Sequence, residues 1–150
     1  MDWQEARKRG LSIVFTNGCF DLIHPGHVAL LEQAKGEGDF LVVGLNSDAS
    51  VRRLKGPSRP IMDQRARRTV LEAIRYVDQV IIFDEDTPLR LIEEIRPDVL
   101  VKGAEYEEEE IVGAELVRSY GGRVVRAEMV RGFSTSAIVS YLRELSRAEE

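Results

Sequence analysis

Five short apolar runs, rich in valine and isoleucine, recur along the 150-residue chain and constrain its fold more than any other feature. They occupy residues 12–16, 40–46, 79–83, 98–103 and 123–128. The first four are almost continuously hydrophobic, which is typical of strands buried on both faces of a sheet. Helical patterns lie between and after them, at about 25–36, 63–75, 87–95, 108–120 and 134–147. This alternation predicts an α/β fold, a Rossmann-like, doubly wound, parallel five-stranded sheet with helices on both faces.

The pattern runs without interruption, so we expect one domain over residues 1–150 with its core at about 11–145. No apolar run approaches the roughly 20 residues of a membrane span, and the charged N-terminal segment predicts no signal peptide. The single cysteine excludes an intrachain disulfide and favours a reducing cytoplasm. The net charge of −5 argues against general nucleic-acid binding. We therefore expect small-molecule partners, neither nucleic acid nor membrane, and local positive charge wherever an anion binds.

The segment "TNGCFDLIHPGH", residues 16–27, follows the first predicted strand and contains both histidines of the chain, His24 and His27. In open parallel sheets, ligands bind outside the carboxyl ends of the strands. Pro25 suits a first helical turn, and Gly26 keeps side-chain bulk away from the amides there. A helix N-terminus has unpaired N–H groups and a partial positive charge, which attract anions. The two imidazoles could therefore donate hydrogen bonds to phosphate oxygens, or carry positive charge as phosphate charge shifts.

Other interpretations of this segment stay open from the residues alone, since histidines are often surface groups or satisfied polar groups. A zinc site would need Cys19, Asp21 or another carboxylate to complete it, and none of these has a recognised ligand spacing. Cys19 fits a small buried residue better than a nucleophile, because no base is arranged for it. The acidic run at 105–110 predicts a solvated turn before a helix, since consecutive residues do not converge on one metal ion.

Two motifs resemble those of a known superfamily. "FDLIHPGH" resembles the HxGH signature of the nucleotidyltransferase superfamily, which includes the cytidylyltransferases and pantetheine-phosphate adenylyltransferase. "GFSTSAI", residues 132–138, resembles the second signature of that superfamily, and its spacing of roughly a hundred residues also matches. A narrower resemblance covers about 11–145 and includes "GLNSDASVRRLKGPSRP" and "DEDTPLRLIEEIRPDVLVKGAEY". These segments are similar to the adenylyltransferase domain of the bacterial ADP-heptose synthesis enzymes.

The narrower resemblance implies adenylyl transfer from ATP to D-glycero-β-D-manno-heptose 1-phosphate, which gives ADP-heptose and pyrophosphate for lipopolysaccharide or other surface glycans. Mg²⁺ is expected to arrive on the ATP phosphates rather than in a carboxylate cage. In many bacteria this domain is fused behind a ribokinase-type sugar kinase. Here we expect the stand-alone form, with a separate sugar kinase supplying the substrate and a homodimer as the family-level expectation.

Three alternatives remain open at this point. One is a cytidylyltransferase for a polyol or alcohol phosphate of the glycerol 3-phosphate type, another is an FMN adenylyltransferase, and the third is a nucleotide-binding sensor without chemistry. Met129 stands where the glycerol-phosphate cytidylyltransferases carry an arginine, and Arg131 lies nearby. This departure favours the heptose type.

The resemblance also implies roles for individual residues. His24 and His27 would stabilise charge on the triphosphate, and Lys55 would be a catalytic phosphate ligand on a mobile loop after the second strand, near Arg52 and Arg59. The implied nucleotide-binding residues follow the first and fourth strands or begin a helix: Asn17, Gly18, Cys19, Phe20, Gly26, Lys102, Gly103, Ser134, Thr135 and Ser136. The residues expected to bind the sugar phosphate are Asn46, Asp48 and Arg53.

Overall fold

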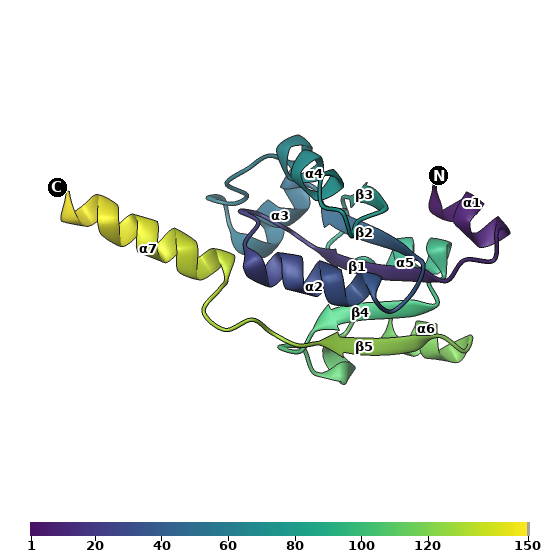
Figure 1. Cartoon of the computed structure of the whole chain (residues 1–150). Helices are drawn as coiled ribbons and strands as arrows, with labels where there is room; N and C mark the ends of the chain where they lie inside the picture. The colour runs from purple at the N-terminus through teal and green to yellow at the C-terminus, as the bar shows by residue number, and fades with distance from the viewer. Residues whose placement is uncertain (150) are drawn as a thin grey trace.

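The computed structural model describes residues 1–149, and its five strands form one parallel sheet (Figure 1). The strands are β1 (Ile13–Gly18), β2 (Phe40–Asn46), β3 (Gln79–Phe83), β4 (Val99–Gly103) and β5 (Arg123–Ala127). Their order is β3-β2-β1-β4-β5, and every neighbouring pair is parallel. The predicted fold class is confirmed, and the predicted strands agree with the observed ones to within two residues at each end. The order reverses between β1 and β4, which places the ligand site of such a fold at their carboxyl ends.

Helices cover both faces of the sheet, as predicted (Figure 1). They are α1 (Trp3–Lys8), α2 (Pro25–Lys35), α3 (Asp48–Lys55), α4 (Gln64–Glu72), α5 (Leu89–Ile95), α6 (Ala114–Ser119) and α7 (Thr135–Ala148), with a short 3₁₀ helix at Glu108–Glu110. Alternate strand residues point to opposite faces. Val14 therefore packs with Leu31 of α2 and Leu71 of α4 in one core cluster. Phe15 packs in the other cluster, with the helices α1, α5 and α6.

Three parts of the chain differ from the prediction. Residues Trp3–Lys8 form the helix α1, where no helix was predicted. The segment after β2, predicted as a mobile loop, forms α3 and places Lys55 at its last residue. Ser47 caps this helix by accepting a hydrogen bond from the Ser50 N–H at 3.1 Å, and Val51 is buried beneath it. The helix predicted at 108–120 is broken, because Gly113 adopts a left-handed backbone with φ of +89° and α6 starts only after it.

The last helix, α7, extends away from the sheet (Figure 1). Ser134 caps it as predicted, since its hydroxyl accepts the Ala137 N–H at 3.0 Å. Val139 is the buried residue of this helix, whereas Tyr141, Leu142 and Leu145 are exposed. Among residues 1–149, none of the helices combines the length and the apolar character that crossing a bilayer requires.

Candidate active site

The loop between β1 and α2 has an unusual backbone. Phe20 and Leu22 both adopt left-handed conformations, with φ of 48° and 54°. Each such residue costs on the order of 1–3 kcal/mol, so the surrounding structure must hold it in place. Phe20 is buried in the core, and the Asp21 carboxylate accepts the backbone N–H groups of Ile61 and Met62 at 2.6 and 3.0 Å. The loop is therefore fixed from both sides before a ligand arrives.

Both histidines take part in capping α2. His24 is the N-cap residue, and its Nδ1 accepts the Gly26 N–H at 3.1 Å. The Nδ1 of His27 accepts the His24 N–H at 3.2 Å, and the two ring centroids lie 3.8 Å apart. Because each Nδ1 is an acceptor, each neutral ring carries its proton on Nε2. The helix cap thus leaves two Nε2–H donors for a ligand, which agrees with the predicted hydrogen-bonding role.

The protonation of these histidines is set by their surroundings. Burial, together with nearby His24, lowers the pKa of His27 to about 4, and Asp21 partly opposes this shift. Burial also lowers the pKa of His24. Both rings are therefore neutral donors near pH 7 in the free protein. Among residues 1–149, no three His, Cys, Asp or Glu side chains are arranged as metal ligands.

We predict that the imidazole NMR signals of His27 in the free protein stay unchanged as the pH falls from 8 towards 5.5. A lowered pKa means that the neutral ring persists below the ordinary histidine value, so the His27 signal should move only as the pH approaches about 4. A ¹³C-resolved titration measures this directly, because the chain has only two histidines. The same titration in urea is the control, and a midpoint near 6.5 for His27 in the folded protein would contradict the neutral-donor assignment.

The second signature meets the first in space. The Thr135 hydroxyl donates to the backbone oxygen of Asp21 at 2.7 Å, and the Phe133 ring is stacked near His24 with centroids 6.1 Å apart. An Nη2 group of Arg59 lies 3.5 Å from the Ser136 hydroxyl. Two motifs about a hundred residues apart in sequence therefore line the same site, as the sequence predicted.

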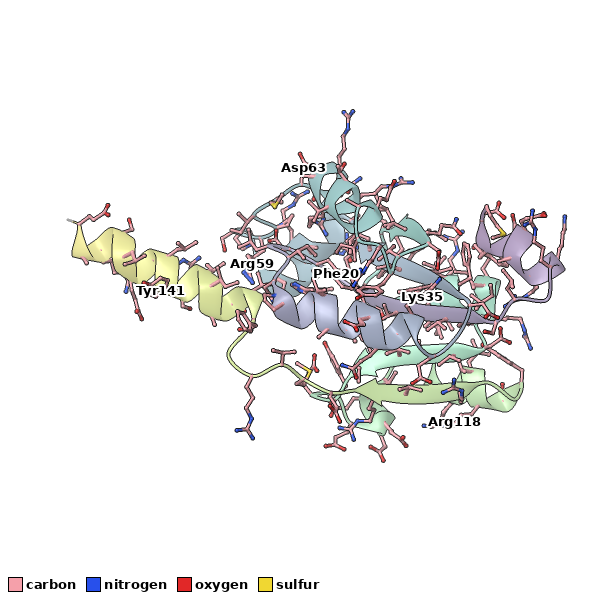
Figure 2. The ribbon with its side chains drawn as sticks, viewed as in Figure 1. Phe20, Lys35, Arg59, Asp63, Arg118 and Tyr141 are labelled. Atoms are coloured by element: carbon pink, nitrogen blue, oxygen red, sulfur yellow. The ribbon has the colours of Figure 1, made fainter. Side chains whose placement is uncertain are left out.

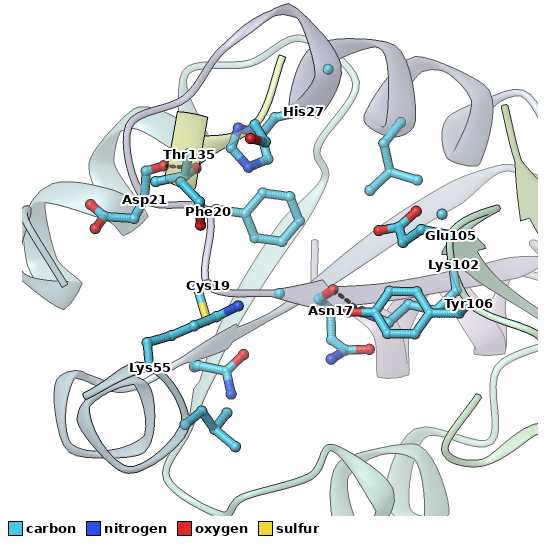
Figure 3. Close-up of a pocket in the computed structure, with 18 of the residues that line it drawn as sticks. Asn17, Cys19, Phe20, Asp21, His27, Lys55, Lys102, Glu105, Tyr106 and Thr135 are labelled. Carbon is cyan, nitrogen blue, oxygen red and sulfur yellow. Dashed lines mark hydrogen bonds between the residues drawn. The ribbon is translucent and has the colours of Figure 1, made fainter. Parts of the chain in front are cut away.

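A pocket of about 590 Å³ opens at the carboxyl ends of the strands (Figure 3). All predicted site residues except Asp48 and Arg53 line it: Asn17, Gly18, Cys19, Phe20, His24, Gly26, His27, Asn46, Lys55, Lys102, Gly103, Ser134, Thr135 and Ser136. Gly26 is needed here, because a Cβ atom at this position would lie 2.8 Å from Cε1 of His24. Burial raises the pKa of the Cys19 thiol, which fits its predicted passive role.

The structure does not bring Asp48 and Arg53 into the lining of this pocket. Asp48 accepts a hydrogen bond from Nη2 of Arg67 at 2.8 Å. Arg53 is on the exposed face of α3 and donates to Asp86 at 2.7 Å. Asp86 itself lines the pocket, so Arg53 contacts a residue of the pocket lining without lining the pocket. The geometry lends no support to direct binding of the sugar phosphate by Asp48 or Arg53.

Arg67 of α4 organises the site, although sequence reasoning did not single it out. Its side chain is fully buried and donates to the backbone oxygens of Cys19, Asn46 and Met62 at 2.7, 2.8 and 3.0 Å, besides Asp48. It thus joins the β1–α2 loop, the end of β2, the start of α3 and the segment before α4. Leu71, which is also buried, lies four positions later on the same face of α4. This helical spacing was the sequence signal that could have identified Arg67 as a buried residue.

Lys102 lies on the side of the pocket away from Lys55 (Figure 3). Its Nζ donates to the backbone oxygen of Asn17 at 2.9 Å. Burial lowers the pKa of Lys102 to about 8, and Glu105 partly opposes this. The acidic run at 105–110 is an exposed turn, as predicted, and its residues Glu105 and Tyr106 also line the pocket. The Glu105 carboxylate lies over Gly103, where a Cβ atom would be only 2.1 Å from Oε2. Glycine at 103 therefore makes room for this carboxylate.

Comparison with known proteins supports these observations. The family model described as cytidylyltransferase-like matches residues 15–140. The chain is 58% identical over 137 residues to the bifunctional protein HldE of Azorhizobium caulinodans, covering 91% of this chain and 29% of that protein. It is 56% identical over 144 residues to the HldE protein of Syntrophotalea carbinolica, covering 96% and 29%. The chain thus spans less than a third of the length of these curated relatives.

A solved structure is also similar to this one. It is the lipopolysaccharide core biosynthesis protein from Thermoplasma volcanium, with a TM-score of 0.66 and 28% sequence identity. The match covers 81% of this chain and 98% of that protein.

Proposed function

The chain belongs to the cytidylyltransferase-like family of nucleotidyltransferases, and we propose that it transfers AMP from ATP to D-glycero-β-D-manno-heptose 1-phosphate. The products are ADP-heptose and pyrophosphate. One observation supports nucleotidyl transfer most directly: two adjacent neutral imidazoles, with ring centroids 3.8 Å apart, share a pocket with Lys55 and the hydroxyls of the second signature. The heptose acceptor is supported by the resemblance to the ADP-heptose synthesis enzymes and by the 56–58% identity to two HldE proteins.

The proposed chemistry needs no nucleophile from the protein. A phosphate oxygen of the sugar phosphate attacks the α-phosphorus of ATP in line, and the bond from that phosphorus to the bridging oxygen breaks. The electron pair leaves with pyrophosphate. The Nε2–H groups of His24 and His27 stabilise the charge that develops at these oxygens, and a preorganised donor of this kind is worth about 10²–10³ in kcat. Lys55, Arg59 and Ser136 hold the outer phosphates.

The two ends of the pocket suit two different parts of the reaction. Asn46 ends β2 and lines the pocket together with Asp86 and Thr87, which follow β3. These polar groups are our candidates for the sugar hydroxyls. At the other end, Lys102 and Glu105 frame the space for the nucleoside. The Asp21 carboxylate already accepts two backbone N–H groups, so we expect Mg²⁺ to enter with ATP as part of the substrate.

Several finer assignments belong to the same proposal. We propose that residues 1–150 form one nucleotidyltransferase domain that works in the cytoplasm, and that a sugar kinase reaction supplies the 1-phosphate. A separate kinase remains a prediction. We also propose a homodimer, and the exposed Tyr141, Leu142 and Leu145 on α7 are the candidate contact surface.

An acceptor panel tests the proposed function. We expect pyrophosphate release with ATP and the β anomer of heptose 1-phosphate, and little with CTP or with glycerol 3-phosphate or FMN as acceptor. Release measured across ATP and CTP with each acceptor, including the α anomer, separates these activities. Activity with CTP and glycerol 3-phosphate alone would overturn the proposal in favour of a cytidylyltransferase. Absence of release with every pair would favour a binding module without chemistry.

A further inference from the structure

The segment that connects β5 to α7, residues 128–134, is held to the rest of the protein at both ends, and we call it the connecting strap. At its start, the Glu128 N–H donates to the side-chain oxygen of Gln33 on α2 at 2.9 Å, and the Gln33 amide donates to the Glu128 backbone oxygen at 3.2 Å. Directly after it, the Thr135 hydroxyl donates to the backbone oxygen of Asp21 at 2.7 Å. The strap therefore runs along α2 towards the start of that helix. Beyond the second tether, α7 projects away from the body of the protein (Figure 2).

Phe133 is the residue of the strap that reaches the histidine pair. The strap turns at Gly132, which has a left-handed backbone with φ of +85°. The Phe133 ring is inclined by 20° to the His24 ring, with 6.1 Å between the two centroids. Aromatic rings attract one another at centroid separations of about 4.5–7 Å. A Cβ atom at Gly26 would lie 3.7 Å from the Phe133 Cβ, so the strap packs against the start of α2 at this point.

The Phe133 ring completes a row of four rings that begins in the core. Phe20 is buried, and its ring centroid lies 5.4 Å from that of His27 (Figure 3). The His27 and His24 centroids are 3.8 Å apart, and the Phe133 ring comes next. The core fixes the inner end of this row. The strap supplies the outer ring, which is 43% exposed and shields His24 from the solvent.

We propose that Phe133 is a positioning residue for His24, because its ring holds the imidazole plane in the orientation that aims the Nε2–H at the substrate. The hydrogen bond from the Gly26 N–H to Nδ1 fixes one point of the imidazole at 3.1 Å. The contact with Phe133 restricts rotation of the imidazole about that point. A donor contributes most to a transition state when its direction is set before the charge develops. The inference rests on the proposed nucleotidyl transfer, and it gives Phe133 no bond to the reacting atoms.

The cover that Phe133 provides also bears on the protonation of His24. Burial lowers the pKa of His24. The titratable groups of the histidine pair and its surroundings are the two rings themselves and the Asp21 carboxylate. Loss of the phenyl ring admits water to His24, and water stabilises the imidazolium, so the pKa of His24 should rise towards the ordinary histidine value. This rise can be measured without any substrate.

The substitutions Phe133→Leu and Phe133→Tyr test the assignment, with Met129→Leu as the matched control. Leucine removes the ring but keeps an apolar side chain, whereas tyrosine keeps the ring. Met129 is another exposed apolar residue of the strap that lines the pocket. In Phe133→Leu we expect kcat to fall roughly threefold to tenfold, the effect of one aromatic pair, with the KM for ATP unchanged. A ¹³C-resolved histidine titration should show a higher His24 midpoint in this variant. Phe133→Tyr should recover most of the kcat, and both Phe133→Tyr and the control should keep the wild-type midpoint.

An unchanged kcat or an unchanged His24 midpoint in Phe133→Leu overturns the inference. A higher KM for ATP at unchanged kcat makes Phe133 a direct substrate contact instead. An equal midpoint shift in Met129→Leu shows a general loosening of the strap, and a tyrosine variant that recovers nothing shows that the ring is not what matters. Because the titration needs no substrate, it separates this inference from the proposed function. If the acceptor panel finds no acceptor while Phe133→Leu alone raises the His24 midpoint, the support of His24 by Phe133 stands and the acceptor assignment falls.

Discussion

Replacing His27 with alanine is expected to lower kcat by about 10²–10³-fold, because it removes a preorganised donor aimed at developing phosphate charge. The same change removes the ring whose centroid lies 3.8 Å from that of His24, and it leaves the His24 N–H without its acceptor. The protein should remain folded, because His24 still caps α2 through Gly26 and loss of one cap bond costs about 1 kcal/mol. Pyrophosphate release at saturating ATP measures the effect, and a thermal melt checks the fold.

Two further substitutions at His27 test whether the ring acts as a neutral hydrogen-bond donor or as a cation. Because burial lowers the pKa of His27 to about 4, the ring acts as a neutral donor in the free protein. His27→Gln retains a neutral N–H donor and should recover part of the lost turnover, whereas His27→Lys introduces a charge beside His24 and should not. If lysine rescues and glutamine does not, the histidine works as a cation. Wild-type turnover in His27→Ala would remove the residue from the mechanism altogether.

The sheet was predictable because burial on both faces leaves a strong signal in the sequence. The runs at 40–46 and 79–83 match β2 and β3 at both ends. Helix α3 was not predictable in the same way, since Arg52, Arg53 and Lys55 are exposed and make the segment look like a polar loop. Its apolar anchor is Val51, and one buried apolar residue in eight gives no helical period.

The residues that line the pocket were predictable where they lie at the end of a strand or the start of a helix. His24, Lys102 and Thr135 follow that rule, and all of them line the pocket. Asp48 also follows a strand, yet its carboxylate is taken by Arg67, which lies 19 residues later in the sequence. A side-chain direction that depends on such a distant partner leaves no local pattern.

The prediction for the segment after β4 is confirmed, since residues 105–110 are exposed and form a turn before the 3₁₀ helix at Glu108–Glu110. The contribution of Glu105 and Tyr106 to the pocket was not predicted, because a run of glutamates is usually solvated. In the structure, the Tyr106 N–H donates to the Gly103 oxygen at 3.1 Å, which turns the chain back towards the sheet. That turn brings Glu105 and Tyr106 to the pocket, and only the three-dimensional path of the chain reveals it.

Replacing Arg67 with methionine is expected to destabilise the protein by about 3–5 kcal/mol, the cost of removing one partner from a buried charged network. Methionine fills much of the space but leaves the backbone oxygens of Cys19 and Asn46 without their donor, besides the Asp48 carboxylate. Urea denaturation measures the change. Arg68→Met is the matched control, because Arg68 is the next residue and its ion pair with Glu72 is exposed. An exposed pair contributes at most about 1 kcal/mol.

Arg67→Lys separates stability from catalysis. An ammonium group keeps the charge but lacks the planar fork that reaches four acceptors on different segments, so part of the network must stay unmade. At a temperature where this variant is fully folded, we expect kcat to fall, because the loop at 16–27 and the segment at 56–63 lose their common support. Near-normal kcat with reduced stability would make Arg67 a purely structural residue. Normal stability in Arg67→Met would mean that the desolvation cost of the guanidinium cancels its hydrogen bonds, and that the loops are aligned by Asp21 alone.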